Sequence, residues 1–109
     1  MQITAGFDSG NIRCIDCSDP SNVRLTINKD HQSDFYQWFH FRASGVCDMP
    51  LKMVIENAKG AAYVGGWENY QAVASYDRQI WFRVPTTWDG ETLTIDHAPE
   101  TDAVYYARV

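Results

Sequence analysis

The chain has 109 residues, of which 45% are hydrophobic and 21% are charged, and its formal net charge is −5. This length suits one domain with a single hydrophobic core, and the composition excludes a chain too polar to fold. The nine basic residues are scattered along an acidic chain. This excludes a binder of nucleic-acid phosphates, because such proteins concentrate Lys and Arg on one surface.

The first eight residues lack the basic stretch and apolar run of a signal peptide, and no later stretch is long and apolar enough to span a membrane. Three cysteines, Cys14, Cys17 and Cys47, leave at least one thiol unpaired. An odd number fits a reducing compartment better than a disulfide framework. We therefore expect a cytoplasmic protein with no membrane partner.

Apolar and polar residues alternate along most of the chain, which is the pattern of β-strands. The clearest run is 22–28, where Val23, Leu25 and Ile27 share one face and polar residues share the other. Short runs of this kind predict about nine strands. They cover residues 2–7, 12–17, 22–28, 35–43, 51–56, 72–77, 80–84, 91–97 and 102–109. The sequence therefore predicts an all-β fold, an antiparallel β-sandwich forming one domain over residues 1–109.

Turn-forming residues separate these strands at 8–10, 19–21, 48–50 and 88–90, where Gly, Pro and Asp supply the backbone angles that reversals need. The one long irregular stretch is 57–70, which contains Tyr63, Trp67 and Tyr70 among three glycines. A loop of this length in a compact domain often binds a ligand or packs against a neighbour.

Two expected strands carry large side chains on both faces. In the first, Phe39 and Phe41 share one face with Phe35. The opposite face holds Tyr36, Trp38, His40 and Arg42, and the strand at 80–84 adds Trp81 and Arg83. Outward strand faces of an isolated sandwich are usually polar, so this row predicts a covering partner. The sequence leaves open the alternative that loops or the other sheet cover these side chains within the domain.

The histidines do not form a convincing metal site. His31, with Asp34 three residues later, could nominally combine with His40 and His97. Three histidines in a chain of this length produce such combinations by chance, so we interpret them as ordinary loop and strand residues. We predict no catalytic residue, no metal ligand and no cofactor in this segment.

Cys14 and Cys17 have the C-x-x-C spacing of a redox pair. In a regular extended strand, however, positions three apart face opposite sides of the sheet. No second C-x-x-C is present to complete a structural zinc site. We therefore expect these thiols to remain unpaired and to serve as packing groups.

Several motifs, taken together, resemble the N-terminal domain that precedes the catalytic domain in the cytosolic carboxypeptidase subfamily of M14 metallocarboxypeptidases. They are FDSGNI at 7–12, DFYQWFHFR at 34–42, IEN at 55–57 leading to GW at 66–67, ASYDR at 74–78 and WFRVPT at 81–86. The resemblance covers most of the chain. It implies an antiparallel β-sandwich beside a larger α/β domain, which holds zinc through a His-x-x-Glu motif and a distant His.

No position of that zinc site is carried over to this sequence, so the resemblance implies zinc only in the catalytic domain. Family members remove C-terminal residues from proteins or peptides. The chain closes on the apolar stretch 104–109, which we interpret as a truncation before the peptidase domain.

Together these observations predict a non-catalytic accessory domain of a cytosolic zinc metallocarboxypeptidase, whose partner is its own C-terminal carboxypeptidase domain. The expected docking residues are Tyr36, Trp38, His40, Arg42, Trp67, Trp81 and Arg83. Self-association of the isolated domain through the uncovered face is left open. The alternative is a free-standing β-sandwich that binds carbohydrate or peptide. It requires Trp67, Trp88 and Tyr63 to lie coplanar and face solvent.

Overall fold

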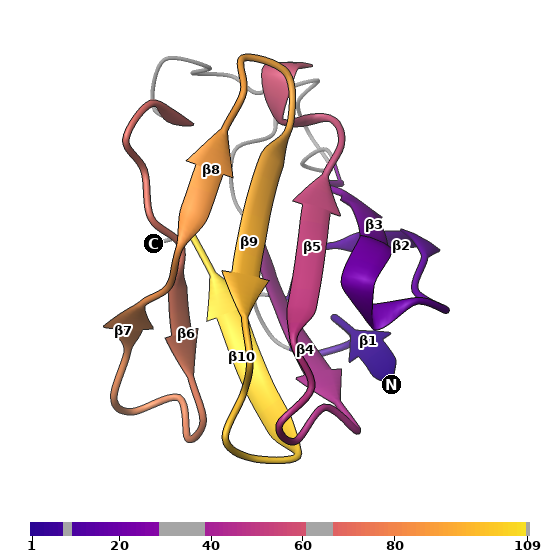
Figure 1. Cartoon of the computed structure of the whole chain (residues 1–109), viewed down its shortest axis with the longest axis vertical. Helices are drawn as coiled ribbons and strands as arrows, with labels where there is room; N and C mark the ends of the chain where they lie inside the picture. Colours follow the sequence, from indigo (N-terminus) through magenta and orange to yellow (C-terminus); the bar gives the residue numbers. More distant parts are fainter. Residues whose placement is uncertain (8–9, 29–38, 61–66, 109) are drawn as a thin grey trace.

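The computed structural model describes residues 1–7, 10–28, 39–60 and 67–108, which form two β-sheets stacked face to face (Figure 1). Sheet I has the spatial order β1 (Gln2–Thr4), β4 (His40–Ser44), β10 (Ala103–Ala107), β6 (Val73–Ser75) and β7 (Phe82–Arg83). Sheet II has the order β2 (Arg13–Asp16), β3 (Val23–Thr26), β5 (Leu51–Ile55), β9 (Leu93–His97) and β8 (Thr86–Trp88). Two single-turn 3-10 helices, η1 (Pro20–Asn22) and η2 (Ala58–Gly60), lie wholly within the described ranges. The predicted all-β sandwich is therefore confirmed.

The strand pairings are antiparallel throughout the described ranges, with one exception. In sheet II, β3 runs parallel to β5, and Val23, Arg24 and Leu25 lie opposite residues 53–55. The chain leaves sheet II after β3, forms β4 in sheet I and returns as β5. Such a long crossover is what a parallel pair requires. Alternation within each strand gives no signal for this direction, so the prediction of a purely antiparallel sandwich missed it.

Strand β8 was not predicted, because Trp88, its last residue, was expected to begin the turn at 88–90. Its residues Thr86, Thr87 and Trp88 follow Pro85 and pair with residues 93–95 of β9. Three residues are too few to display a period of two. The predicted turn that follows is present, since the Asp89 carboxylate accepts hydrogen bonds from two backbone amides of the next residues.

The core lies between the sheets and is built from the inward positions of alternating strands. Sheet II contributes its β3, β5 and β9 aliphatic side chains, and sheet I contributes Phe41, Val104 and Tyr106, all fully buried. In β3 the predicted alternation is confirmed, because Val23 and Leu25 are buried whereas Arg24 is exposed. Burying this apolar surface stabilises the fold by roughly 25 cal/mol per Å² removed from water.

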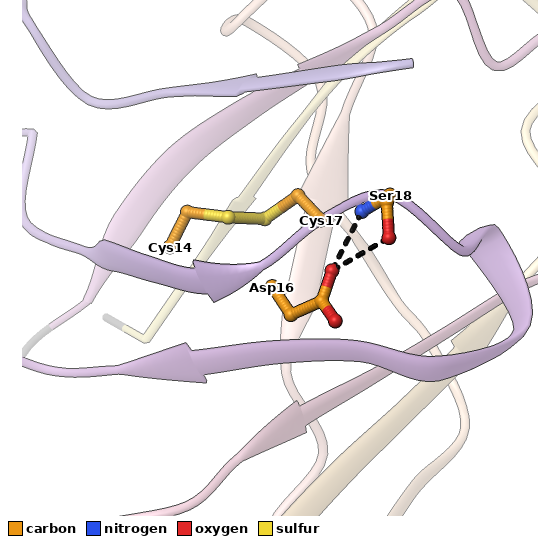
Figure 2. Close-up of a disulfide and its surroundings, with 4 residues drawn as sticks. All are labelled: Cys14, Asp16, Cys17 and Ser18. Atoms are coloured by element: carbon orange, nitrogen blue, oxygen red, sulfur yellow. Dashed lines mark hydrogen bonds between the residues drawn. A yellow bond between two sulfur atoms is a disulfide. The ribbon is translucent and has the colours of Figure 1, made fainter.

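The prediction that Cys14 and Cys17 remain unpaired is wrong, because the two form a disulfide (Figure 2). The strand carries a β-bulge: Cys14 lies opposite Leu25 and Asp16 lies opposite Arg24 of the partner strand, which leaves Ile15 as an extra residue. A bulge of this kind shifts the alternation by one position. Cys17 therefore returns to the side of Cys14, with their Cα atoms 6.2 Å apart.

The remaining cysteine, Cys47, is an exposed free thiol.

In the part of the chain that the structure describes, no helix has the length and apolar composition needed to cross a membrane.

Candidate interaction surface on the outer face of sheet I

The outward row of sheet I is assembled by strand register. Thr4 of β1, Arg42 of β4, Tyr105 of β10 and Ser75 of β6 lie side by side across the four strands. Alternation directs their side chains away from the core, because the neighbouring positions, among them Phe41 in β4, are buried inward. The predicted division of β4 into an inward phenylalanine face and an outward His40 and Arg42 face is thus confirmed in the described part of that strand.

The loop residues Phe7 and Trp81 pack onto this face beside the strand residues His40 and Tyr105, and we call these four the outer aromatic cluster. The Phe7 ring meets the His40 ring edge-on at 4.9 Å between centroids and the Tyr105 ring at 5.7 Å. The Trp81 ring also contacts His40, with 5.9 Å between the ring centroids. All four side chains are partly exposed. Sheet I therefore offers a broad, partly covered aromatic surface to its surroundings.

Arg78 completes this surface. Its Cζ atom lies 5.5 Å from the Phe7 ring centre and 5.3 Å from the Tyr105 ring centre, which is within cation-π range. The turn that presents Arg78 has a positive backbone φ of 65° at this residue. Ser75 and Asp77 hold the turn, since the Ser75 hydroxyl accepts from the Arg78 amide at 2.7 Å and the Asp77 carboxylate accepts from Ile80 at 3.0 Å.

The pKa of His40 is set mainly by its burial and secondarily by a neighbouring positive charge. Burial among the rings lowers the pKa of His40 below its usual value, and the nearby Arg78 guanidinium lowers it further. His40 is therefore a neutral ring at pH 7, able to pack against aromatic neighbours without a desolvated charge.

The predicted docking residues are only partly brought together. His40 and Trp81 are in contact, and Arg42 lies in the same outward face. Arg83 of β7 lies in the row of His40, opposite Val73 of β6, and its side chain donates a hydrogen bond to the Gln71 carbonyl at 2.7 Å. The other two predicted residues, Tyr36 and Trp38, lie outside the described residues.

Trp67 is the clear correction, because it is fully buried inside this domain and has no surface to offer a partner. Its indole Nε1 donates to the Ala58 carbonyl at 2.9 Å, and its ring stacks on Phe39 at 6.4 Å. The Arg108 guanidinium lies 4.5 Å above the ring centre. The glycine-rich context suggested a binding loop, but tertiary packing places this tryptophan in the core.

Three members of the surface were missed by sequence reasoning: Phe7, Arg78 and Tyr105. The alternation of β10, in which Val104 and Tyr106 point inward, is a signal that could have found Tyr105. Phe7 and Arg78 lie in loops after β1 and β6, where no periodic pattern states the direction of a side chain.

A second feature is a hollow of about 460 Å³, lined by Tyr76, Ile80, Phe82 and His97 together with residues 77, 98 and 100. His97 Nδ1 lies 2.7 Å from the Tyr106 hydroxyl, and burial lowers the pKa of His97 while raising that of Tyr106. Ile80, at the edge of the hollow, is 73% exposed.

Within the described ranges, no group of three or more His, Cys, Asp or Glu side chains lies close enough to hold a metal ion. The predicted loop histidine, His31, lies outside those ranges. His40 and His97, which the sequence analysis considered as nominal ligands, are occupied in ring contacts with different neighbours.

Comparison with known proteins gives a consistent set of relatives. A family model described as "Cytosolic carboxypeptidase N-terminal domain" matches residues 3–109. The chain is 43% identical over 107 residues to an uncharacterised protein, ZMO1242, of Zymomonas mobilis, covering 98% of this chain and 28% of that protein.

Two solved structures are similar to this chain in both sequence and fold. A metallo-carboxypeptidase from Burkholderia cenocepacia matches 97% of this chain with 52% identity and a TM-score of 0.95. A metallo-carboxypeptidase from Pseudomonas aeruginosa, solved with (2-guanidinoethylmercapto)succinic acid, matches 98% with 46% identity and a TM-score of 0.95. This chain spans only 28% and 29% of those two chains.

Proposed function

Because this chain belongs to the cytosolic carboxypeptidase N-terminal domain family, we propose that it is a non-catalytic accessory domain that docks on the carboxypeptidase domain of the same polypeptide. The observation that carries the proposal is the outer aromatic cluster with Arg42 and Arg78, which gives one face of the sandwich the composition of an interface. Trp, Tyr and Arg are the residue types that most often anchor protein–protein contacts.

The share of the relatives that this chain matches supports a linked partner. The two solved metallo-carboxypeptidases extend well beyond the 28% and 29% that this chain matches. We propose that the remaining part of this polypeptide supplies the peptidase activity, holds zinc and removes C-terminal amino acids from peptides or proteins in the cytoplasm.

The proposed docking surface consists of His40, Arg42, Trp81 and Arg83, extended by the loop residues Phe7 and Arg78. Tyr36 and Trp38 remain part of the proposal on strand alternation alone. Desolvated Trp and Arg anchors each contribute on the order of 2 kcal/mol at an interface, so a few of them suffice to hold two linked domains together. The buried Trp67 would support the surface from below and would not touch the partner.

The proposal is tested in the full-length protein by placing a protease site after residue 109 and cleaving it. We expect the two fragments to elute together in gel filtration, and Trp81→Ala to make them separate. Ile80→Ala is the matched control, because this neighbouring side chain is exposed and lines the hollow on the other side of the same loop. Fragments that stay together in both variants would refute this docking surface.

A second candidate function, binding of carbohydrate or peptide, draws on one observation. A hollow of about 560 Å³ is lined by Tyr70 and Trp88 together with Glu68, Asn69 and residues 86, 87 and 90. Aromatic rings beside amide and carboxylate groups suit a sugar. The three-residue platform that this function required is reduced, however, because Trp67 is buried below Trp88. Titration of the wild type and of a Trp88→Phe variant with oligosaccharides, read from tryptophan fluorescence, distinguishes this candidate.

A further inference from the structure

Charge is distributed unevenly over the two sheets. The chain carries 14 acidic and 9 basic residues, yet none of the five described strands of sheet I contains Asp or Glu. The same strands contribute Arg42 and Arg83, and Arg78 lies above them on the rings of Phe7 and Tyr105. An acidic domain thus has one face that is aromatic and basic.

Two of the three arginines on this face, Arg42 and Arg78, lack a counter-charge among the described residues. Neither Arg42 nor Arg78 forms an ion pair within 1–7, 10–28, 39–60 and 67–108, whereas Arg24 on sheet II pairs with Glu56 at 2.7 Å. The carboxylate adjacent in sequence to Arg78 is Asp77, whose Oδ1 accepts from the backbone amides of Gln79 and Ile80. That carboxylate is therefore already engaged in holding the turn.

The surroundings make these guanidinium groups strong recognition elements. Arg78 is exposed and therefore accessible to a partner, with the Phe7 and Tyr105 rings against its guanidinium. Once a docked partner excludes water, that charge interacts more strongly with an opposite charge than it does in bulk water. A guanidinium also presents its N–H groups in a planar fork that matches a carboxylate in two parallel hydrogen bonds. Arg78 also lies close enough to His40 to lower its pKa, in addition to the larger effect of burial.

We infer that the surface covering the outer face of sheet I is acidic and presents carboxylates to Arg42 and Arg78, and that it belongs to the carboxypeptidase domain of the same polypeptide. The inference rests on the proposed function for the identity of the partner and goes beyond it by stating the chemistry of the partner surface. Charge complementarity selects this chemistry, because apolar or basic surfaces would leave two guanidinium groups covered and unpaired.

The experiment uses the cleavable full-length protein and compares two charge reversals of equal size. Arg42→Glu with Arg78→Glu changes the outer face of sheet I. Arg13→Glu with Lys52→Glu makes the same change at exposed outward positions of sheet II. Fragment association is measured by gel filtration and by titration between 50 and 500 mM NaCl, with Trp81→Ala as a third variant.

We expect the wild-type dissociation constant to rise about tenfold across this salt range, because exposed ion pairs are screened. The sheet I reversal should raise it at least tenfold at 50 mM NaCl and remove most of the salt dependence, while the sheet II reversal leaves both unchanged. Far-UV circular dichroism of each variant checks that the fold is retained.

Two results would overturn the inference while leaving the docking proposal intact. One is that Trp81→Ala separates the fragments but the sheet I reversal behaves like the sheet II control. The other is that the reversal abolishes self-association of the 109-residue fragment and leaves docking unchanged, which would assign the carboxylates to a second copy. If no variant, Trp81→Ala included, affects association, the docking surface itself is wrong.

Discussion

The outer faces of the two sheets differ sharply although the same alternation generates both. On sheet II, Arg24 pairs with Glu56, and Lys52 lies opposite Asp96 across β5 and β9. On sheet I the corresponding positions hold aromatic rings and arginines without acidic partners among the described residues. A face whose charged side chains are paired with each other is suited to remain exposed to solvent. The face of sheet I lacks that internal pairing, which is why we assign it to an interface.

The largest loss of stability is expected from a substitution in the core between the sheets, at Trp67. Trp67→Ala should lower the free energy of unfolding by about 3–5 kcal/mol, because it leaves a cavity in the core and removes the hydrogen bond to Ala58. Trp81→Ala, at a partly exposed site, should cost less than half of this. Urea unfolding of the 109-residue chain gives both values, and equal costs would contradict the distinction between a core tryptophan and an outer one.

A medium effect is expected at the edge of sheet II, where the disulfide joins Cys14 and Cys17. Reduction should lower the free energy of unfolding by about 2 kcal/mol, the chain-entropy value for a loop of this size. Thermal melts with and without reductant measure the loss, and Cys14→Ser with Cys17→Ser should match the reduced protein. A double variant that responds to reductant as the wild type does would refute this assignment.

The pH dependence of stability should distinguish the contribution of the histidines from that of the carboxylates. Burial lowers the pKa of His40 and His97 in the fold, so protonation favours the unfolded chain. Their contribution to stability is complete above the ordinary value of 6.5 and is lost as the pH falls through the lowered values. Backbone hydrogen bonds lower the pKa values of Asp77 and Asp89. The contribution of these carboxylates to stability is therefore lost only when the pH falls below about 3.8, the ordinary pKa of Asp.

Chemical unfolding between pH 7.5 and 3 should therefore show two descending steps. In His40→Gln the step near neutral pH should shrink, whereas the acid step should persist. A His40→Gln variant with an unchanged profile would mean that His40 titrates normally and is not desolvated by the cluster on sheet I.

The smallest effect is expected on the outer face of sheet II. Arg24→Gln removes the ion pair with Glu56, in which both side chains are partly exposed, and should cost less than about 1 kcal/mol. Docking should not change. A larger loss of stability, or separation of the cleaved fragments, would show that sheet II takes part in the interface.

Much of the fold was predictable because β-strand alternation reports directly on burial. It assigned Val23, Leu25 and Phe41 to the core correctly. The parallel pairing of β3 and β5 and the three-residue β8 were not predictable, since neither leaves a periodic signal. The bulge at Ile15 brings two cysteines to one side of the strand. The prediction that they face opposite sides assumed a regular strand.

The site was less predictable than the fold. Alternation found His40 and Arg42, but loop residues complete the surface, and their directions depend on turns such as the one closed by Ser75 and Asp77. Trp67 was misassigned because a glycine-rich aromatic loop reads the same in sequence whether it folds inward or outward.

Hydroxyl-radical footprinting of Trp81 and Trp88 tests the central claim most directly. Trp81 and Trp88 are both partly exposed in this domain, one over sheet I and the other in β8 of sheet II. We predict that Trp81 oxidises readily in the 109-residue chain and is protected several-fold in the full-length protein, while Trp88 oxidises equally in both. Equal oxidation of Trp81 in the two forms would contradict a docking surface on sheet I.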